Sequence, residues 1–122
     1  MPTFSDRSMK RLQTCDQRLQ ILMAEVIKER DCTILCGYRS PEEQEQAFHD
    51  GRSKAHYGQS KHNTYPSSAV DVMPYPIDWN DIDRLKDFAN FVLGKASELN
   101  IPVRWGGNFK NFFDGPHFEL EG

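Results

Sequence analysis

Two short stretches of the chain hold side chains that could together perform hydrolysis. His62 and Asp71 lie nine residues apart, and a second stretch carries Asp114 and His117 three residues apart. A catalytic zinc ion usually takes three protein ligands and keeps a fourth position for a water molecule, whose pKa it lowers from about 15.7 to about 7. His62, Asp71 and His117 are the candidate ligands. Asp114 is then free to take the proton from that water and pass it to a leaving amine. The pattern therefore predicts a peptidase-like hydrolase.

Simpler structural roles compete with this interpretation. Asp114 precedes a Gly-Pro pair, and all three residue types are common in turns. A turn and a catalytic role are compatible here, because the turn could be what aims the carboxylate at the site. His49 and His56 have no such neighbours, and we interpret them as ordinary surface or packed histidines.

The motifs around these residues resemble those of a known family. Ser-x-His ending at His62, Ala-x-Asp ending at Asp71 and Asp-x-x-His-Phe-Glu beginning at Asp114 are similar to the motifs of the LAS-type zinc peptidases of bacterial cell walls. That group includes D-alanyl-D-alanine carboxypeptidases and phage L-alanyl-D-glutamate endolysins. The resemblance runs from about Gly37 to Leu120, and its further marks are Gly37 to Ser40 with Gln44, residues 69–72, and Trp105 to Gly107.

This resemblance implies a zinc-dependent peptidase, with one catalytic zinc ion, that cleaves the stem peptides of bacterial peptidoglycan. An L-alanyl-D-glutamate endopeptidase of the phage endolysin kind is the first implied activity. A D-alanyl-D-alanine carboxypeptidase or dipeptidase stays open, as does a non-catalytic wall-binding module that keeps zinc for folding. Structural zinc sites usually have four ligands, so three ligands beside a free carboxylate favour the enzyme.

The resemblance also assigns roles around the metal ligands. Arg39 is expected to bind substrate and assist catalysis, because an arginine can direct two donors at a carboxylate or at a developing oxyanion. Gln44 is expected to bind substrate or to support Arg39, and Ser60 to hydrogen-bond near the metal or the substrate. Trp105 is either a cleft wall for the peptide or a core aromatic. Because side chains alternate along a strand, Glu119 is not expected to orient the nearby ligand histidine.

One departure from the family pattern concerns the loop between the first two ligands. The common form places the aspartate seven residues after the histidine with a glycine between them, whereas Asp71 follows His62 by nine and Ser67 stands where the glycine would be. Two extra loop residues cost little free energy, because loop closure depends weakly on length. Pro66 could hold a turn there.

Length, charge and hydropathy limit the other possibilities. A chain of 122 residues suits a single peptidase domain spanning 1–122. Fifteen basic and eighteen acidic residues give a net charge of −3 without blocks of like charge, so neither nucleic acid nor membrane is an expected partner. We find no signal-peptide pattern and no apolar run of about 20 residues. We therefore expect a monomer made in the cytoplasm. The resemblance to phage endolysins implies that it acts on the cell wall after release through a separate membrane lesion.

The three cysteines indicate free thiols. Cys15, Cys32 and Cys36 form an odd set, which fits a reducing compartment better than a disulfide framework. Cys32 and Cys36 lie on an apolar, strand-like run, where a spacing of four residues separates them by about 13 Å, too far to share a metal.

Hydrophobic periodicity and turn residues predict the elements that must position the site. Leu19, Leu22 and Val26 recur at helical spacing after Thr14 and Gln17, which resemble a capping box. Ser40 begins a second helix. The expected helices cover 14–30, 40–50 and 80–100, the strands 33–38, 69–73, 101–105 and 116–120, and a long polar loop covers 52–68. This order predicts an α+β fold, a small antiparallel sheet with helices packed against it. The family resemblance implies the LAS-type version of this fold, which is similar to that of hedgehog and D-Ala-D-Ala peptidases.

Overall fold

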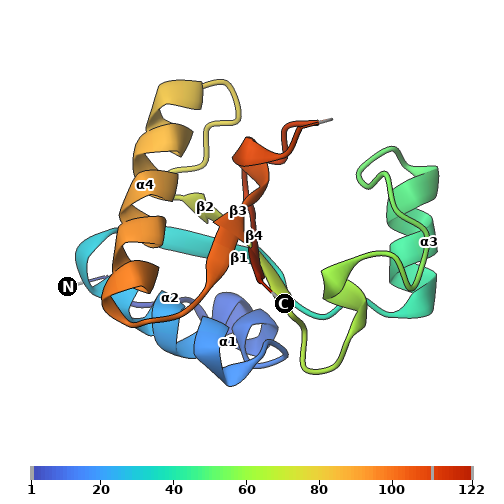
Figure 1. The fold of residues 1–122 in the computed structure, drawn as a ribbon, viewed down its shortest axis with the longest axis horizontal. Helices are drawn as coiled ribbons and strands as arrows, with labels where there is room; N and C mark the ends of the chain where they lie inside the picture. Colours follow the sequence, from blue (N-terminus) through green and yellow to red (C-terminus); the bar gives the residue numbers. More distant parts are fainter. Residues whose placement is uncertain (1, 111, 122) are drawn as a thin grey trace.

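A small antiparallel sheet forms the centre of the molecule (Figure 1). The computed structural model describes residues 2–110 and 112–121. Within these residues, four strands form one sheet in the order β1-β2-β4-β3, and every pairing is antiparallel. The strands are β1 (Cys32–Cys36), β2 (Ala69–Pro74), β3 (Val103–Trp105) and β4 (His117–Leu120). The predicted α+β fold is therefore confirmed.

The two central strands give the sheet two chemically different faces. Val70 and Val72 of β2 and Phe118 of β4 are fully or almost fully buried in the hydrophobic core. Because side chains alternate along a strand, the residues next to these three in the sequence point to the opposite face. These include Asp71 and His117, which the strand register places directly opposite each other. One face of the sheet thus builds the core and the other carries the polar residues.

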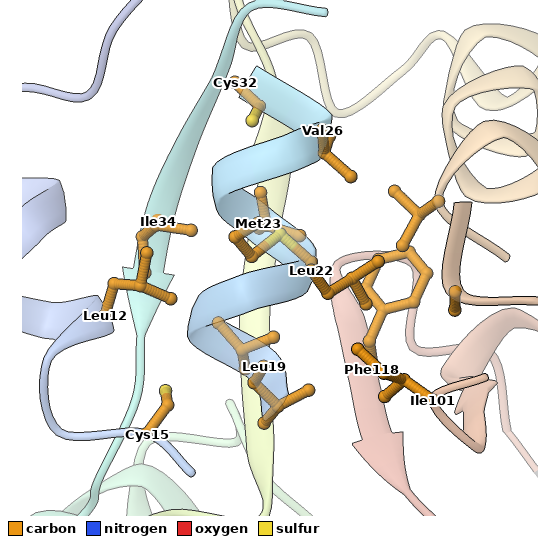
Figure 2. Packing of buried hydrophobic residues seen from close by; sticks show 14 of the residues in the cluster. Leu12, Cys15, Leu19, Leu22, Met23, Val26, Cys32, Ile34, Ile101 and Phe118 are labelled. Atoms are coloured by element: carbon orange, nitrogen blue, oxygen red, sulfur yellow. The ribbon is translucent and has the colours of Figure 1, made fainter. Parts of the chain in front are cut away.

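Helix α2 (Gln17–Glu29) covers the core face. Its apolar stripe includes Leu22 and Val26 and lies between Ile34 of β1 and Phe118 of β4 (Figure 2). A fully buried side chain of this size contributes roughly 1.5–3 kcal/mol. The predicted start of this helix was wrong: Asp16 is the N-cap and accepts a hydrogen bond from the backbone of Arg18.

Thr14 instead connects three segments. Its hydroxyl donates to the carbonyl of Arg11 and accepts a hydrogen bond from the backbone N–H of Tyr38. The neighbouring Gly37 has no room for a side chain, because a Cβ there would collide with Thr14 and Arg11. Glycine is therefore required where the end of β1 passes the N-terminal region.

Helix α1 (Asp6–Leu12) was not predicted from the sequence. Ser5 caps its N-terminus, and Leu12 is its one buried apolar side chain. A seven-residue helix with a single buried apolar residue has no periodic stripe, and a helix this short needs tertiary contacts to form. One such contact is the hydrogen bond from the backbone of Ile34 to the Ser8 hydroxyl, 3.1 Å long.

The other two helices agree with their predicted positions. Helix α3 (Pro41–His49) begins with a capping box between Ser40 and Glu43. Helix α4 (Ile82–Glu98) is capped by Asp81 and packs its apolar face on the core beside α2. In Figure 1, α3 stands apart from α2 and α4, at the end of the sheet away from the core helices. Across the described ranges, no helix has the length and apolar character that a membrane crossing requires.

The cysteines are free, as predicted. Cys15 and Cys32 are buried, and burial raises the pKa of each thiol to about 12. Cys36 is partly buried and lies beside Arg39, whose guanidinium is 3.6 Å from the sulfur.

Candidate metal centre and active site

The three candidate ligands converge on the polar face of the sheet. His62 lies on the single-turn helix η1 (Lys61–Asn63), Asp71 on β2 and His117 on β4. Nε2 of His62, Oδ1 of Asp71 and Nδ1 of His117 are each 3.2 Å from the other two atoms. In the described part of the chain, these residues are the one group of three or more histidine, cysteine or carboxylate side chains with metal-ligand spacing.

The hydrogen bonds behind the two imidazoles show that this cluster fits a cation. Nδ1 of His62 lies 2.8 Å from the carbonyl oxygen of Gly37, and Nε2 of His117 lies 2.8 Å from Oε1 of Glu119. Both oxygens are acceptors, so these ring nitrogens donate and the facing nitrogens of the neutral rings present lone pairs. Two lone pairs and a carboxylate oxygen repel one another unless a positive charge lies between them. Imidazole and carboxylate are also ordinary zinc ligands.

The pKa shifts of the three candidate ligands also indicate that the cluster favours a positive charge. Burial disfavours the charged form of His62, but the Asp71 carboxylate outweighs burial and raises the pKa of His62 to about 10. For His117, burial again opposes the charged form, and hydrogen bonds to Asp71 and Glu119 raise its pKa to about 9. The two histidines hold the pKa of Asp71 well below its usual range, against the effect of burial. A divalent cation would replace the protons that these shifts describe.

Arg39 lies beside the cluster and Gln44 lies behind Arg39. The guanidinium of Arg39 is 3.6 Å from Oδ2 of Asp71 and donates to Oε1 of Gln44 at 3.0 Å. Gln44 is fully buried, and its amide donates to the Ser53 hydroxyl and the Ala55 carbonyl. The expectation that Gln44 contacts substrate is therefore corrected: its hydrogen bonds are used within the protein, where they hold Arg39.

Asp114 lies at the open side of the cluster. Its Oδ2 is 3.9 Å from Nδ1 of His117, and its side chain is 38% exposed. Burial and the negative charge of Asp71 raise the pKa of Asp114. Its backbone N–H donates to the carbonyl of Gly106, where a Cβ would collide with the Asp114 carbonyl and lie 2.9 Å from its Cβ. Glycine at position 106 therefore lets the segment after β3 pack against the turn that carries Asp114.

Glu119 contributes to the site, against our expectation. It lies two residues after His117 on β4, and positions two apart share a face of a strand. Its carboxylate also accepts hydrogen bonds from Arg104 and lies 3.7 Å from Lys61. Burial opposes ionisation, but the hydrogen bonds from His117 and Arg104 lower the pKa of Glu119 to about 2. The expectation was wrong because alternation separates neighbouring positions of a strand, whereas His117 and Glu119 are two positions apart.

Ser60 and Trp105 have roles within the protein. The Ser60 hydroxyl caps η1 by accepting a hydrogen bond from the backbone of His62, and it also lines the cleft. Trp105 is 5% exposed, belongs to the hydrophobic core and donates its indole N–H to the carbonyl of Gly115. Of the two interpretations of Trp105, the core aromatic is correct, and the cleft wall is formed by other aromatic residues.

The cluster lies at the floor of an open cleft of about 1530 Å³. Arg39, His62, Asp71, Asp114 and His117 all line it. Three convergent ligand-type side chains, a neighbouring carboxylate and room for a peptide are typical of metal-dependent hydrolases.

Comparison with known proteins identifies the family within this class. The chain belongs to the phage L-alanyl-D-glutamate peptidase family, whose sequence model matches residues 2–121. It is 28% identical to the L-alanyl-D-glutamate peptidase of Escherichia phage T5, over 96% of each chain. It also resembles the crystal structure of the Serratia marcescens L-Ala D-Glu endopeptidase ChiX, with a TM-score of 0.81 and 28% identity, over 98% of this chain and 90% of that one. The family resemblance inferred from the motifs is confirmed.

Proposed function

We propose that this protein is a zinc-dependent endopeptidase that cleaves the bond between L-Ala and D-Glu in peptidoglycan stem peptides. One observation carries the proposal: two imidazole nitrogens and a carboxylate oxygen lie 3.2 Å apart at the floor of an open cleft. Membership of the phage L-alanyl-D-glutamate peptidase family supports the choice of bond.

His62, Asp71 and His117 would hold the zinc ion. A bound zinc ion would supply Lewis acidity at the scissile carbonyl and would make a water molecule acidic enough to be activated near neutral pH. The acceptors behind the ligands would keep each ring in the tautomer that metal binding requires, since the Gly37 carbonyl and the Glu119 carboxylate accept the N–H on the far side of the two rings.

Asp114 would act as the general base and then as the general acid. It is partly exposed in the cleft and 3.9 Å from His117, so it can reach a water molecule that approaches the ligand cluster. Its carboxylate would take a proton from the attacking water and deliver it to the leaving amine of D-Glu. A raised pKa suits this role, because proton transfer is most efficient when the pKa of the group approaches the working pH.

Arg39 would bind the substrate and steady the charge that develops on the carbonyl oxygen. Gln44 fixes one guanidinium nitrogen and Asp71 lies near the other, so the group is held at the edge of the cleft with little freedom. A cation held in this way stabilises negative charge without having to reorganise during the reaction.

The test is mass spectrometry of defined muropeptides after incubation with zinc-loaded protein. Chelator-treated protein and the isosteric variant Asp114→Asn serve as controls. Cleavage between L-Ala and D-Glu that is lost in both controls supports the proposal. Release of terminal D-Ala would instead identify a carboxypeptidase, and binding to sacculi without any product would identify a wall-binding module.

The protein would act as a monomer, since one chain supplies all three ligands and the base. Light scattering of the zinc-loaded protein tests this. We further propose that it reaches the wall after another protein has opened the membrane. Expression in the bacterial cytoplasm alone should then cause no lysis.

A further inference from the structure

The cleft has two unlike walls. Figure 1 shows α3 on one side of the central strands and α4 on the other, with the segment after β3 at the end of the sheet. The α3 side is lined by polar and charged residues, among them Arg39, Arg52, Lys54 and Glu42. The opposite side, here called the aromatic wall, is lined by Trp79, Ile82, Leu85, Phe109, Phe112 and Phe113.

The aromatic wall begins next to a candidate metal ligand. The ring of Phe109 lies 5.7 Å from that of His117, and the ring of Phe112 lies 5.3 Å from that of Phe109, measured between centroids. Phe113 packs edge-on against the buried Trp105, with centroids 5.8 Å apart. The wall is therefore continuous with the site and supported from behind by the core.

The outer side chains of this wall remain available for contact. Trp79 is 55% exposed, Phe113 49%, Ile82 40% and Phe112 39%. Exposed apolar groups gathered along one side of a cleft indicate a binding surface, because water solvates them poorly. Carboxylates lose hydration against such a surface without gaining a partner.

The substrate has two chemically different ends. After the scissile bond, the stem peptide carries the carboxylates of D-Glu and of the residues that follow it. Before the bond lie L-Ala and the lactoyl-sugar unit, which are uncharged and rich in C–H groups. One residue spans about 3.6 Å, so the sugar lies close to the reacting carbonyl. We propose that the aromatic wall binds the muramoyl end of the substrate, and that the enzyme therefore prefers stem peptides still attached to glycan.

This inference rests on the proposed function, and two substrates test it. One is a muramoyl-L-Ala-D-Glu-diamino acid peptide, and the other is the same peptide without the sugar. The wild type should show the higher kcat/KM on the first. Trp79→Ala should lower kcat/KM on the sugar-bearing peptide by about three- to tenfold, through KM, and change it less than twofold on the free peptide. Phe112→Ala should act in the same direction.

Tyr57→Ala is the matched control, because Tyr57 is an aromatic residue of similar exposure, 45%, that does not line the cleft. Equal kcat/KM of the wild type on both substrates, or equal losses on both in Trp79→Ala, would overturn the inference. Calorimetry with Asp114→Asn separates this outcome from failure of the proposed function. If the wild type cleaves neither peptide, the binding affinities still test the role of the wall. Tighter binding of the sugar-bearing peptide than of the free peptide, with the difference reduced by Trp79→Ala, supports that role. Equal affinities for the two peptides refute it.

Discussion

Replacing Glu119 should weaken metal binding even though Glu119 is not a ligand. Its carboxylate accepts the Nε2–H of His117 at 2.8 Å and so keeps the lone pair of Nδ1 directed at the cluster. Without this acceptor, the ring can adopt the other tautomer or rotate. Losing a partner of this kind typically costs about 10- to 100-fold in metal affinity, or about 1.4–2.7 kcal/mol. We expect Glu119→Ala to fall in that range.

A conservative variant separates orientation from charge. Glu119→Gln keeps an oxygen that can accept from His117 but loses the negative charge that Arg104 and Lys61 also contact. Charged hydrogen bonds are roughly twice as strong as neutral ones, so this variant should lose about three- to tenfold. Glu98→Ala, on an exposed carboxylate at the end of α4, should have no effect on metal affinity.

Two assays measure the effect. Competition with a chromophoric chelator gives the zinc affinity directly. Thermal unfolding with and without zinc gives the linked stability, in which a tenfold weaker affinity removes about 1.4 kcal/mol, equivalent to about 3–6 °C in a protein of this size. Subtracting the melting temperature in chelator corrects for any general loss of stability. If Glu119→Ala binds zinc as tightly as the wild type, the strand alone orients His117 and the reasoning fails.

Three further predictions concern the reaction and its metal. Asp114→Asn should lower kcat about 100-fold or more and leave the zinc affinity unchanged. Muropeptide kinetics measure kcat, and chelator competition measures the zinc affinity. Weaker zinc binding in this variant would indicate that Asp114 is a ligand. Because burial and Asp71 raise the pKa of Asp114, activity should fall on the acid side at a pH above the ordinary aspartate pKa of 3.8, as a pH-rate profile would show. In chelator, the raised pKa values of His62 and His117 stabilise the fold fully below about pH 6.5, and this contribution should decline progressively above pH 6.5 and be lost by about pH 10. Melting temperatures that stay flat across this range would argue against the shifts.

The parts of the fold that were predicted correctly have local causes. Helix α3 carries its own start signal in Ser40, Pro41 and Glu43, and α4 carries a long apolar stripe. Both signals are visible within a few turns of sequence. Helix α1 has an N-cap in Ser5 but no apolar stripe, and it depends on contacts with β1, which lies more than 20 residues away along the chain.

Motifs identified the residues of the site but not the direction in which each one faces. Gln44 and Trp105 occur at positions where the resemblance suggested substrate contact, yet both side chains are buried. A glutamine that binds substrate and a glutamine that holds an arginine have the same sequence signature. The difference arises from the packing of α3 against the loop that contains Ser53 and Ala55, which no local pattern specifies.

The two extra residues between His62 and Asp71 are accommodated because the intervening loop is fixed at its base. The N–H of Ser68 donates to the carbonyl of Lys61, next to the first ligand, at 3.0 Å. Ser67 exchanges backbone hydrogen bonds with Thr14 and Asp16, each 2.8 Å long, and its hydroxyl donates to the Ala69 carbonyl at the start of β2. The extra residues therefore lie within 64–66, outside the hydrogen bonds that join η1 to the start of β2. The positions of the two ligands depend on those hydrogen bonds and not on the number of residues in the loop.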